Sequence, residues 1–157
     1  MRNRGLQPRQ VDLSSSGVRS ARMDPSGPGL RKCSPNPVLP LRVLLVDDDA
    51  AILRAYRRVL SPPHHIVVAQ SGREALEILA RQPFDCVVCD CAMPEMSGEE
   101  LYEQARLQHP RLAHRFLFCS GDLSEASAQL PPDQLLHKPV NRGVLLAAIE
   151  QVCTAEG

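Results

Sequence analysis

The sequence predicts an α/β fold in which five parallel strands form a doubly wound sheet between two layers of helices. Three observations support this prediction. Short apolar runs alternate with helical patterns from residue 41 onward. The runs are apolar on consecutive residues, which is typical of strands that are buried on both faces of a parallel sheet. Capping signals mark where the intervening helices begin. The order of the strands in the sheet does not follow from this pattern.

Each predicted strand is an apolar run that is too short to form a helix. The five runs are Val43 to Val46, Ile66 to Ala69, Cys86 to Cys89, Phe116 to Cys119 and Leu135 to Leu136. Because strands that alternate with helices favour parallel pairing, we expect helices on both faces of the sheet.

The first three helices are predicted by apolar spacing and by capping residues. The first helix ends before the prolines at 62–63, because proline cannot continue a helix. Ser71 with Glu74, and Ser97 with Glu100, have the capping-box spacing, in which a hydroxyl and a carboxylate satisfy free backbone donors. The apolar stripe of the first helix comprises Ile52, Leu53, Tyr56, Val59 and Leu60.

Two more helices are predicted after the fourth and fifth strands. Asp122 and Glu125 give a weaker capping signal for a short fourth helix, which the prolines at 131–132 must end. Asn141 can cap the fifth helix. The apolar stripe of that helix comprises Val144, Leu145, Ala148, Ile149 and Val152.

Residues 1–40 differ in composition from the rest of the chain. They contain six Pro, four Gly and six Ser without apolar periodicity, which predicts a disordered tail, or in part an untranslated segment if Met23 is the true start. The tail has seven basic and two acidic residues, whereas the remainder has eleven basic and sixteen acidic ones. An acidic folded part argues against nucleic-acid binding by that part.

The composition also predicts a cytoplasmic protein without disulfides. No run of about 18 apolar residues is present to span or bind a membrane, and no segment resembles a secretory signal. Four of the six cysteines lie in or beside apolar runs, so we expect free thiols. Cys86 and Cys89 have the C-x-x-C spacing, but residues three apart in a strand face opposite sides and cannot share a metal.

Acidic residues follow two of the predicted strands. Asp47, Asp48 and Asp49 come directly after the first strand, and Asp90 comes directly after the third. In open parallel sheets, ligands bind at the carboxyl ends of the strands. If the two strands are neighbours, each pair of carboxylates at about 4 Å repels by on the order of 4 kcal/mol at an effective dielectric near 20. A divalent cation would relieve this repulsion, and ligands that are all oxygen favour Mg²⁺ over zinc.

A hydroxyl and an amine reach the same edge of the predicted sheet. Ser120 ends the fourth strand, Lys138 follows the fifth, and Gly121 leaves room beside them. A carboxylate can accept a phosphoryl group, while an ammonium and a hydroxyl can stabilise its oxygens. Each residue alone has a simpler explanation, such as a helix cap or a solvated charge. Their joint placement at four strand ends predicts an aspartyl phosphate site.

The sequence resembles the response-regulator receiver family in four blocks that occur in the family's order. These blocks are VLLVDDD at 43–49, DCAMPEMSG at 90–98, FCSGD at 118–122 and HKPV at 137–140. The resemblance covers residues 41–153 and implies a stand-alone receiver domain. It also implies the flavodoxin-like strand order 2-1-3-4-5.

By position, the resemblance implies that Asp90 is the phosphoacceptor, and that Ser120 and Lys138 contact the phosphoryl group. The implied Mg²⁺ ligands are Asp47, Asp48, Asp90 and the backbone carbonyl of Ala92. The bond between Lys138 and Pro139 would be cis. The family often has Tyr or Phe three residues before the lysine, where this chain has Leu135, so we expect no coupling through an aromatic side-chain flip.

The resemblance also implies the partners of the protein. A sensor histidine kinase or a histidine phosphotransfer protein would donate the phosphoryl group, and a downstream protein would respond to it. The chain ends shortly after the fifth helix, so we expect no attached output domain and no turnover of a separate substrate. We expect a monomer or a weak dimer.

Two alternatives stay open at this point. A haloacid-dehalogenase-like phosphatase would also use the D-x-D spacing of residues 47–49, with Ser120 and Lys138 in a suitable order. Such an enzyme needs an acidic pair after the lysine, where this chain has only Glu150 and Glu156, and it leaves Asp90 unexplained. A receiver-like scaffold that is never phosphorylated is the second alternative.

Overall fold

The computed structural model describes residues 39–122 and 130–154, all of which belong to the unit Pro37–Gly157. The predicted tail and the predicted fourth helix fall on residues 1–38 and 123–129, outside the described residues. The described elements are β1 (Arg42–Val46), α1 (Ala50–Leu60), β2 (His65–Ala69), α2 (Gly72–Arg81), β3 (Cys86–Asp90), α3 (Gly98–Gln108), the 3₁₀ helix η1 (Pro110–Arg115), β4 (Phe116–Ser120), the 3₁₀ helix η2 (Pro132–Gln134), β5 (Leu135–His137) and α4 (Arg142–Thr154).

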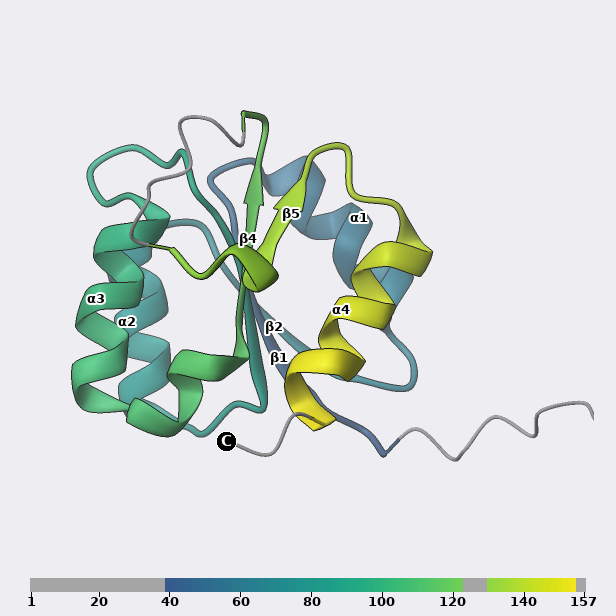
Figure 1. The fold of residues 1–157 in the computed structure, drawn as a ribbon, viewed down its shortest axis with the longest axis horizontal. Coiled ribbons are helices and arrows are strands. Elements are labelled where there is room, and N and C mark those ends of the chain that lie inside the picture. Colours follow the sequence, from purple (N-terminus) through teal and green to yellow (C-terminus); the bar gives the residue numbers. More distant parts are fainter. Residues whose placement is uncertain (1–38, 123–129, 155–157) are drawn as a thin grey trace, which may run out of the picture. The chain divides into compact units, whose positions relative to one another are not determined.

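The five strands form one parallel sheet in the order β2-β1-β3-β4-β5 (Figure 1). Both the five predicted strands and the strand order implied by the resemblance are therefore confirmed. Because β1 lies between β2 and β3, the winding of the chain reverses beside β1. That position is where open α/β sheets bind ligands.

Helices cover both faces of the sheet, with α1 and α4 on one side and α2 and α3 on the other (Figure 1). Neighbouring residues of a strand contribute to opposite faces, as the pleat requires. In β1, for example, Val43 and Leu45 pack with α1 and α4, whereas Leu44 and Val46 pack with α2 and α3. Burial on both faces explains why each strand is continuously apolar.

The C-x-x-C pair follows the same alternation. Cys86 packs on the α1 and α4 side, and Cys89 packs on the α2 and α3 side. The two thiols therefore cannot share a metal ion, as predicted. All five cysteines among the described residues are free thiols.

Only one of the two predicted capping boxes is complete. In α3, the Glu100 amide donates to Ser97 Oγ at 3.2 Å, and the Ser97 amide donates to Glu100 Oε2 at 2.9 Å. In α2, Ser71 caps as predicted, but Glu74 Oε2 accepts instead from the Gln70 amide at 2.7 Å. The two N-caps also differ in backbone conformation, with a φ angle of −153° at Ser71 and −68° at Ser97.

The final helix, α4, has the predicted cap and most of the predicted stripe. Asn141 Oδ1 accepts a hydrogen bond from the Val144 amide at 3.0 Å. The side chains of Leu145, Ile149 and Val152 are buried. Val144, which was predicted to belong to the stripe, is 47% exposed and does not share its burial. It lies about 100° around the helix from Leu145, at the edge of the stripe.

His64 is a buried histidine that the fold keeps neutral. Its Nδ1 accepts a hydrogen bond from the Leu41 amide at 3.3 Å. Burial lowers the pKa of His64 below its ordinary 6.5, against an opposing effect of Glu150. The unfolded chain therefore takes up a proton near pH 6.5, whereas the folded chain takes it up only at lower pH. Stability should be complete above pH 6.5 and should decrease as the pH falls below it.

Urea denaturation between pH 7.5 and 5.5 tests this prediction. His64→Asn provides an acceptor near the position of Nδ1 without a titrating ring. The free energy of unfolding should therefore decrease less between pH 7.5 and 5.5 in this variant than in the unmodified chain. The exposed neighbour His65 supplies the control, because His65→Asn should keep the full decrease. An unchanged pH dependence in His64→Asn would contradict the prediction.

Candidate functional site

The pairing of β1 with β3 brings the acidic residues of the two strands together. Val46 is in register with Cys89, so Asp47 and Asp90 follow at adjacent strand ends. The three consecutive aspartates have different environments. Asp49 caps α1 by accepting from the Ala51 amide at 2.7 Å, while Asp47 is buried and accepts from the Asp49 amide at 2.9 Å.

Asp47, Asp48 and Asp90 form a carboxylate cluster. Each of them offers one oxygen, and these oxygens lie within 4.8 Å of one another. Asp47 is 4% exposed and Asp90 is 8% exposed, whereas Asp48 faces solvent. A set of carboxylate oxygens that is open to water on one side suits Mg²⁺, which prefers oxygen ligands and retains several waters. These residues therefore fit the predicted metal ion.

Lys138 places its ammonium group against this cluster. Its Nζ lies 3.0 Å from Asp90 Oδ1 and 3.2 Å from Asp47 Oδ2. Burial acts to lower the pKa of Lys138, but the hydrogen bond to Asp90 and the charge of Asp47 outweigh it and raise the pKa to about 12. The lysine is thus a permanent cation at neutral pH. The bond from Lys138 to Pro139 is cis, as the resemblance implied.

The ionised form of Asp47 is destabilised by its surroundings, and Lys138 only partly offsets this effect. Burial raises the pKa of Asp47, and the charge of Asp90 acts in the same direction. The Asp49 amide and Lys138 oppose this shift without reversing it. Additional positive charge would therefore stabilise the ionised cluster.

Ser120 and Ala92 reach the same edge with different contacts. The Ser120 hydroxyl donates to the carbonyl of Asp122 at 2.7 Å and accepts from the Asp122 amide at 3.2 Å. The structure thus brings Ser120 to the strand end, but its hydroxyl is turned toward its own loop. The Ala92 amide donates to Asp90 Oδ1 at 3.4 Å. A metal-binding role for the Ala92 carbonyl stays a prediction.

Tyr56 is a neighbour of the site that the sequence pattern assigned only to the core. It comes from α1 and, with Asp47 and Asp90, lines a small cavity beneath the cluster. Burial raises the pKa of Tyr56, and the charges of Asp47 and Asp90 add to this effect. Helical spacing places Tyr56 on the buried side of α1 but cannot show which strand ends it meets. No signal in the sequence identifies it.

The loop after Asp90 is held by a close backbone contact. The Gly98 amide donates to the Cys91 carbonyl at 3.0 Å. A Cβ atom on Gly98 would lie 2.5 Å from the Asp90 carbonyl oxygen and 3.1 Å from Cys91 Cα. Both neighbours are backbone atoms and cannot move away independently. This glycine allows α3 to begin directly against the backbone that follows Asp90.

Gly98→Ala should therefore lower the free energy of unfolding by about 1–3 kcal/mol, the usual range for overpacking. Chemical denaturation measures this loss. Gly121→Ala is the matched control, because within the described residues no heavy atom beyond its chain neighbours lies within 4 Å of a Cβ built on Gly121. Equal stability of the two alanine variants would show that the loop can relax.

Three side chains in the loop after Asp90 are at least partly buried. The thiol of Cys91 is kept protonated, because burial and the charge of Asp90 raise its pKa to about 11. Met93 is buried in the core on the α2 and α3 side, and Met96 packs against this core. Among the described residues, no helix is long and apolar enough to cross a membrane.

Comparison with known proteins identifies this arrangement. The family described as "Response regulator receiver domain" matches residues 43–150. The chain belongs to the response-regulator receiver family. Receiver domains of this family act in two-component signalling, interact with histidine kinases and downstream targets, and bind Mg²⁺ at an acidic pocket. Receiver domains of this family are generally not enzymes.

Similar proteins include longer regulators and single receivers. The receiver is 38% identical over 112 residues to response regulator MprA of Mycolicibacterium vanbaalenii, covering 69% of this chain and 48% of MprA. It is 34% identical over 114 residues to transcriptional regulatory protein GlrR of Escherichia coli, covering 71% of this chain and 26% of GlrR. The chain thus matches about half of MprA and about a quarter of GlrR.

The solved structures of receivers agree with this fold. The chemotaxis protein CheY4 of Vibrio cholerae superposes with a TM-score of 0.65 at 28% identity, covering 72% of this receiver and 98% of CheY4. A receiver domain protein from Clostridium thermocellum superposes with a TM-score of 0.65 at 25% identity, covering 72% and 94% of the two chains.

Proposed function

We propose that this receiver accepts a phosphoryl group on Asp90 in a Mg²⁺-dependent reaction. The observation that carries the proposal is the position of the Asp90 carboxylate. It lies at the meeting point of β1 and β3, within the carboxylate cluster, with Lys138 Nζ at 3.0 Å. The exposed side of the cluster, at Asp48, leaves the donor a path to the acceptor.

The transfer makes one bond and breaks one bond. A carboxylate oxygen of Asp90 attacks the phosphorus of a phosphohistidine, and the bond from phosphorus to the histidine nitrogen breaks. The displaced imidazole keeps the electron pair and becomes the leaving group. The Lys138 ammonium lies 3.0 Å from Asp90 Oδ1, where its positive charge can stabilise the phosphoryl oxygens as the new bond forms.

We assign the roles of the other residues by the charge or hydrogen bond that each can supply to the phosphoryl group or to the metal ion. Lys138 Nζ lies between Asp47 and Asp90, so it can form an ion pair with a phosphoryl oxygen on Asp90 while it keeps its ion pair with Asp47. Ser120 must turn from Asp122 to donate to a phosphoryl oxygen. Asp47, Asp48, Asp90 and the Ala92 carbonyl would hold Mg²⁺, which when bound screens the negative charge of the incoming group.

The partners that we propose follow from family membership. A cytoplasmic sensor histidine kinase or a histidine phosphotransfer protein donates to Asp90, and a downstream protein recognises the phosphorylated form. Because Leu135 has no aromatic ring and packs against the core on the α2 and α3 side, we propose a response without an aromatic flip at this position. We propose that the receiver works as a monomer or a weak dimer.

Acetyl phosphate tests the function without a cognate kinase. The protein is incubated with this donor in Mg²⁺ or in excess chelator, and its intact mass is measured. We expect the mass of one added phosphoryl group in Mg²⁺ and little labelling in chelator. An unlabelled protein that stays folded would favour the scaffold alternative and contradict the proposal.

A further inference from the structure

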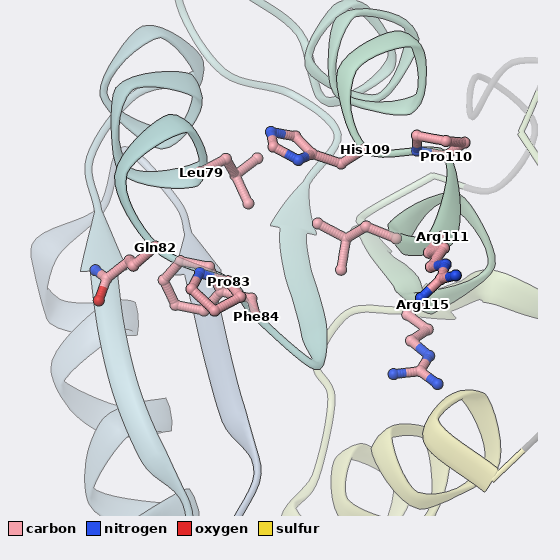
Figure 2. A pocket seen from close by; sticks show the side chains of 9 residues that line it. Leu79, Gln82, Pro83, Phe84, His109, Pro110, Arg111 and Arg115 are labelled. Atoms are coloured by element: carbon pink, nitrogen blue, oxygen red, sulfur yellow. The ribbon is translucent and has the colours of Figure 1, made fainter.

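A second cavity lies at the end of the sheet opposite to Asp90. It has a volume of about 450 Å³ and is formed by the end of α2, the loop that leads into β3, and η1, which leads into β4 (Figure 2). It therefore lies at the amino ends of β3 and β4, whereas Asp90 ends β3 at the other edge. We call it the basal pocket. The proposed phosphoryl transfer makes no use of it.

One side of the basal pocket is apolar. Leu79, Pro83, Phe84 and Leu112 line it, and Figure 2 shows the rings of Pro83 and Phe84 side by side. Leu79 is 4% exposed and Leu112 is 7% exposed, so the floor belongs to the rigid core. Cavities of roughly 300–1,000 Å³ with apolar walls and a few polar groups are typical of small-molecule sites. The volume therefore suits a small organic ligand.

The other side of the basal pocket is cationic. Arg111 and Arg115 come from η1 and lie across from Pro83 and Phe84 (Figure 2). Among the residues that the structure describes, the ion pairs within 4.0 Å include neither arginine. A guanidinium group presents a planar set of donors that matches a carboxylate. Two such groups beside an apolar wall favour a ligand with a negative end.

The opposing charges nearby are weaker than this pair. Asp85 lies next to Phe84, but its carboxylate accepts from the Arg42 amide at 2.8 Å. The Arg42 guanidinium lies 5.8 Å from the centre of the Phe84 ring and adds a third cation. The carboxyl ends of α2 and α3 contribute partial negative charge, equivalent to roughly half a charge each. The formal charges of the three arginines outweigh those of Asp85 and the two helix ends, which favours an anionic ligand.

We propose that the basal pocket binds a small organic carboxylate with a flat apolar body. The body would lie against Phe84 and Leu112, and the carboxylate would accept hydrogen bonds from Arg111 and Arg115. An inorganic anion would leave the apolar floor exposed, and a neutral apolar molecule would leave the guanidinium groups unused.

Titration of the full ¹⁵N-labelled chain with 2-naphthoate, followed by NMR, tests the proposal. We expect saturable shifts of the amides of Leu79, Phe84 and Leu112. The double variant Arg111→Gln/Arg115→Gln should bind about tenfold more weakly or worse, as expected for lost charge-assisted hydrogen bonds. The matched control is Arg54→Gln/Arg73→Gln, which removes the same charge from exposed helix positions and should change binding less than about twofold.

Two other probes separate the parts of the proposal. The neutral 2-naphthamide should bind about tenfold more weakly than 2-naphthoate. Sulfate at equal ionic strength should not displace bound 2-naphthoate. Equal binding of the amide, or undiminished binding by the double variant, would overturn the carboxylate assignment. If the double variant fails to fold, Arg111→Gln alone replaces it. Asp90→Asn should bind 2-naphthoate as the unmodified chain does, so failure here is distinguishable from failure of the proposed function.

Discussion

Replacing Asp90 by asparagine should abolish phosphorylation by acetyl phosphate. The substitution replaces the nucleophilic carboxylate with an amide of nearly the same shape, and an amide is a far weaker nucleophile. The fold should survive, because Lys138 retains Asp47 as its partner at 3.2 Å. The change also removes one of the clustered negative charges, so the free energy of unfolding should stay the same or rise slightly.

Intact mass spectrometry measures the labelling, and thermal unfolding checks the fold. Asp49→Asn is the matched control, since it makes the same chemical change in the same acidic run. Asparagine caps helices about as well as aspartate, so α1 and the labelling should both persist. Undiminished labelling of Asp90→Asn would move the acceptor to another residue.

Replacing Asp48 by alanine should weaken Mg²⁺ binding by at least about tenfold, or about 1.4 kcal/mol. Asp48 is the solvent-facing member of the carboxylate cluster, so its loss leaves the core packing unchanged. The substitution removes both a ligand and a repulsive charge. The metal-free protein should therefore be as stable as the unmodified chain, or slightly more so.

Isothermal titration calorimetry with MgCl₂ compares the two proteins directly. Asp133→Ala serves as the control, because Asp133 is an exposed acid outside the cluster. This control loses the same formal charge and should bind Mg²⁺ with unchanged affinity. An Asp48→Ala titration that matches the control would exclude Asp48 as a ligand.

Local patterns predicted most of the secondary structure. The five strands begin and end within one residue of the apolar runs, since a strand that is buried on both faces must be apolar throughout. The helices of the described residues also begin where their caps predict. Ser71, Ser97 and Asn141 each accept from a backbone amide of the first turn. These contacts span only three residues, so short-range sequence is sufficient to specify them.

The errors concern contacts that depend on angles or on packing. Glu74 accepts a hydrogen bond from the Gln70 amide and not from that of Ser71, whose φ angle differs from that of the complete capping box at Ser97. Val144 is exposed because the stripe of α4 meets the sheet on one side only. Tyr56 meets the acidic cluster because α1 packs beside the ends of β1 and β3. None of these outcomes follows from spacing along the chain.

The sequence by itself determined which chemical groups stand at the ends of the strands: the acids of β1 and β3, the hydroxyl of β4 and the amine after β5. Only the tertiary structure decided that these groups meet, because Asp47 and Lys138 are far apart in the chain and are joined at 3.2 Å by the strand order. The basal pocket has the same origin, since its apolar and cationic sides come from separate segments that only the packed sheet brings together.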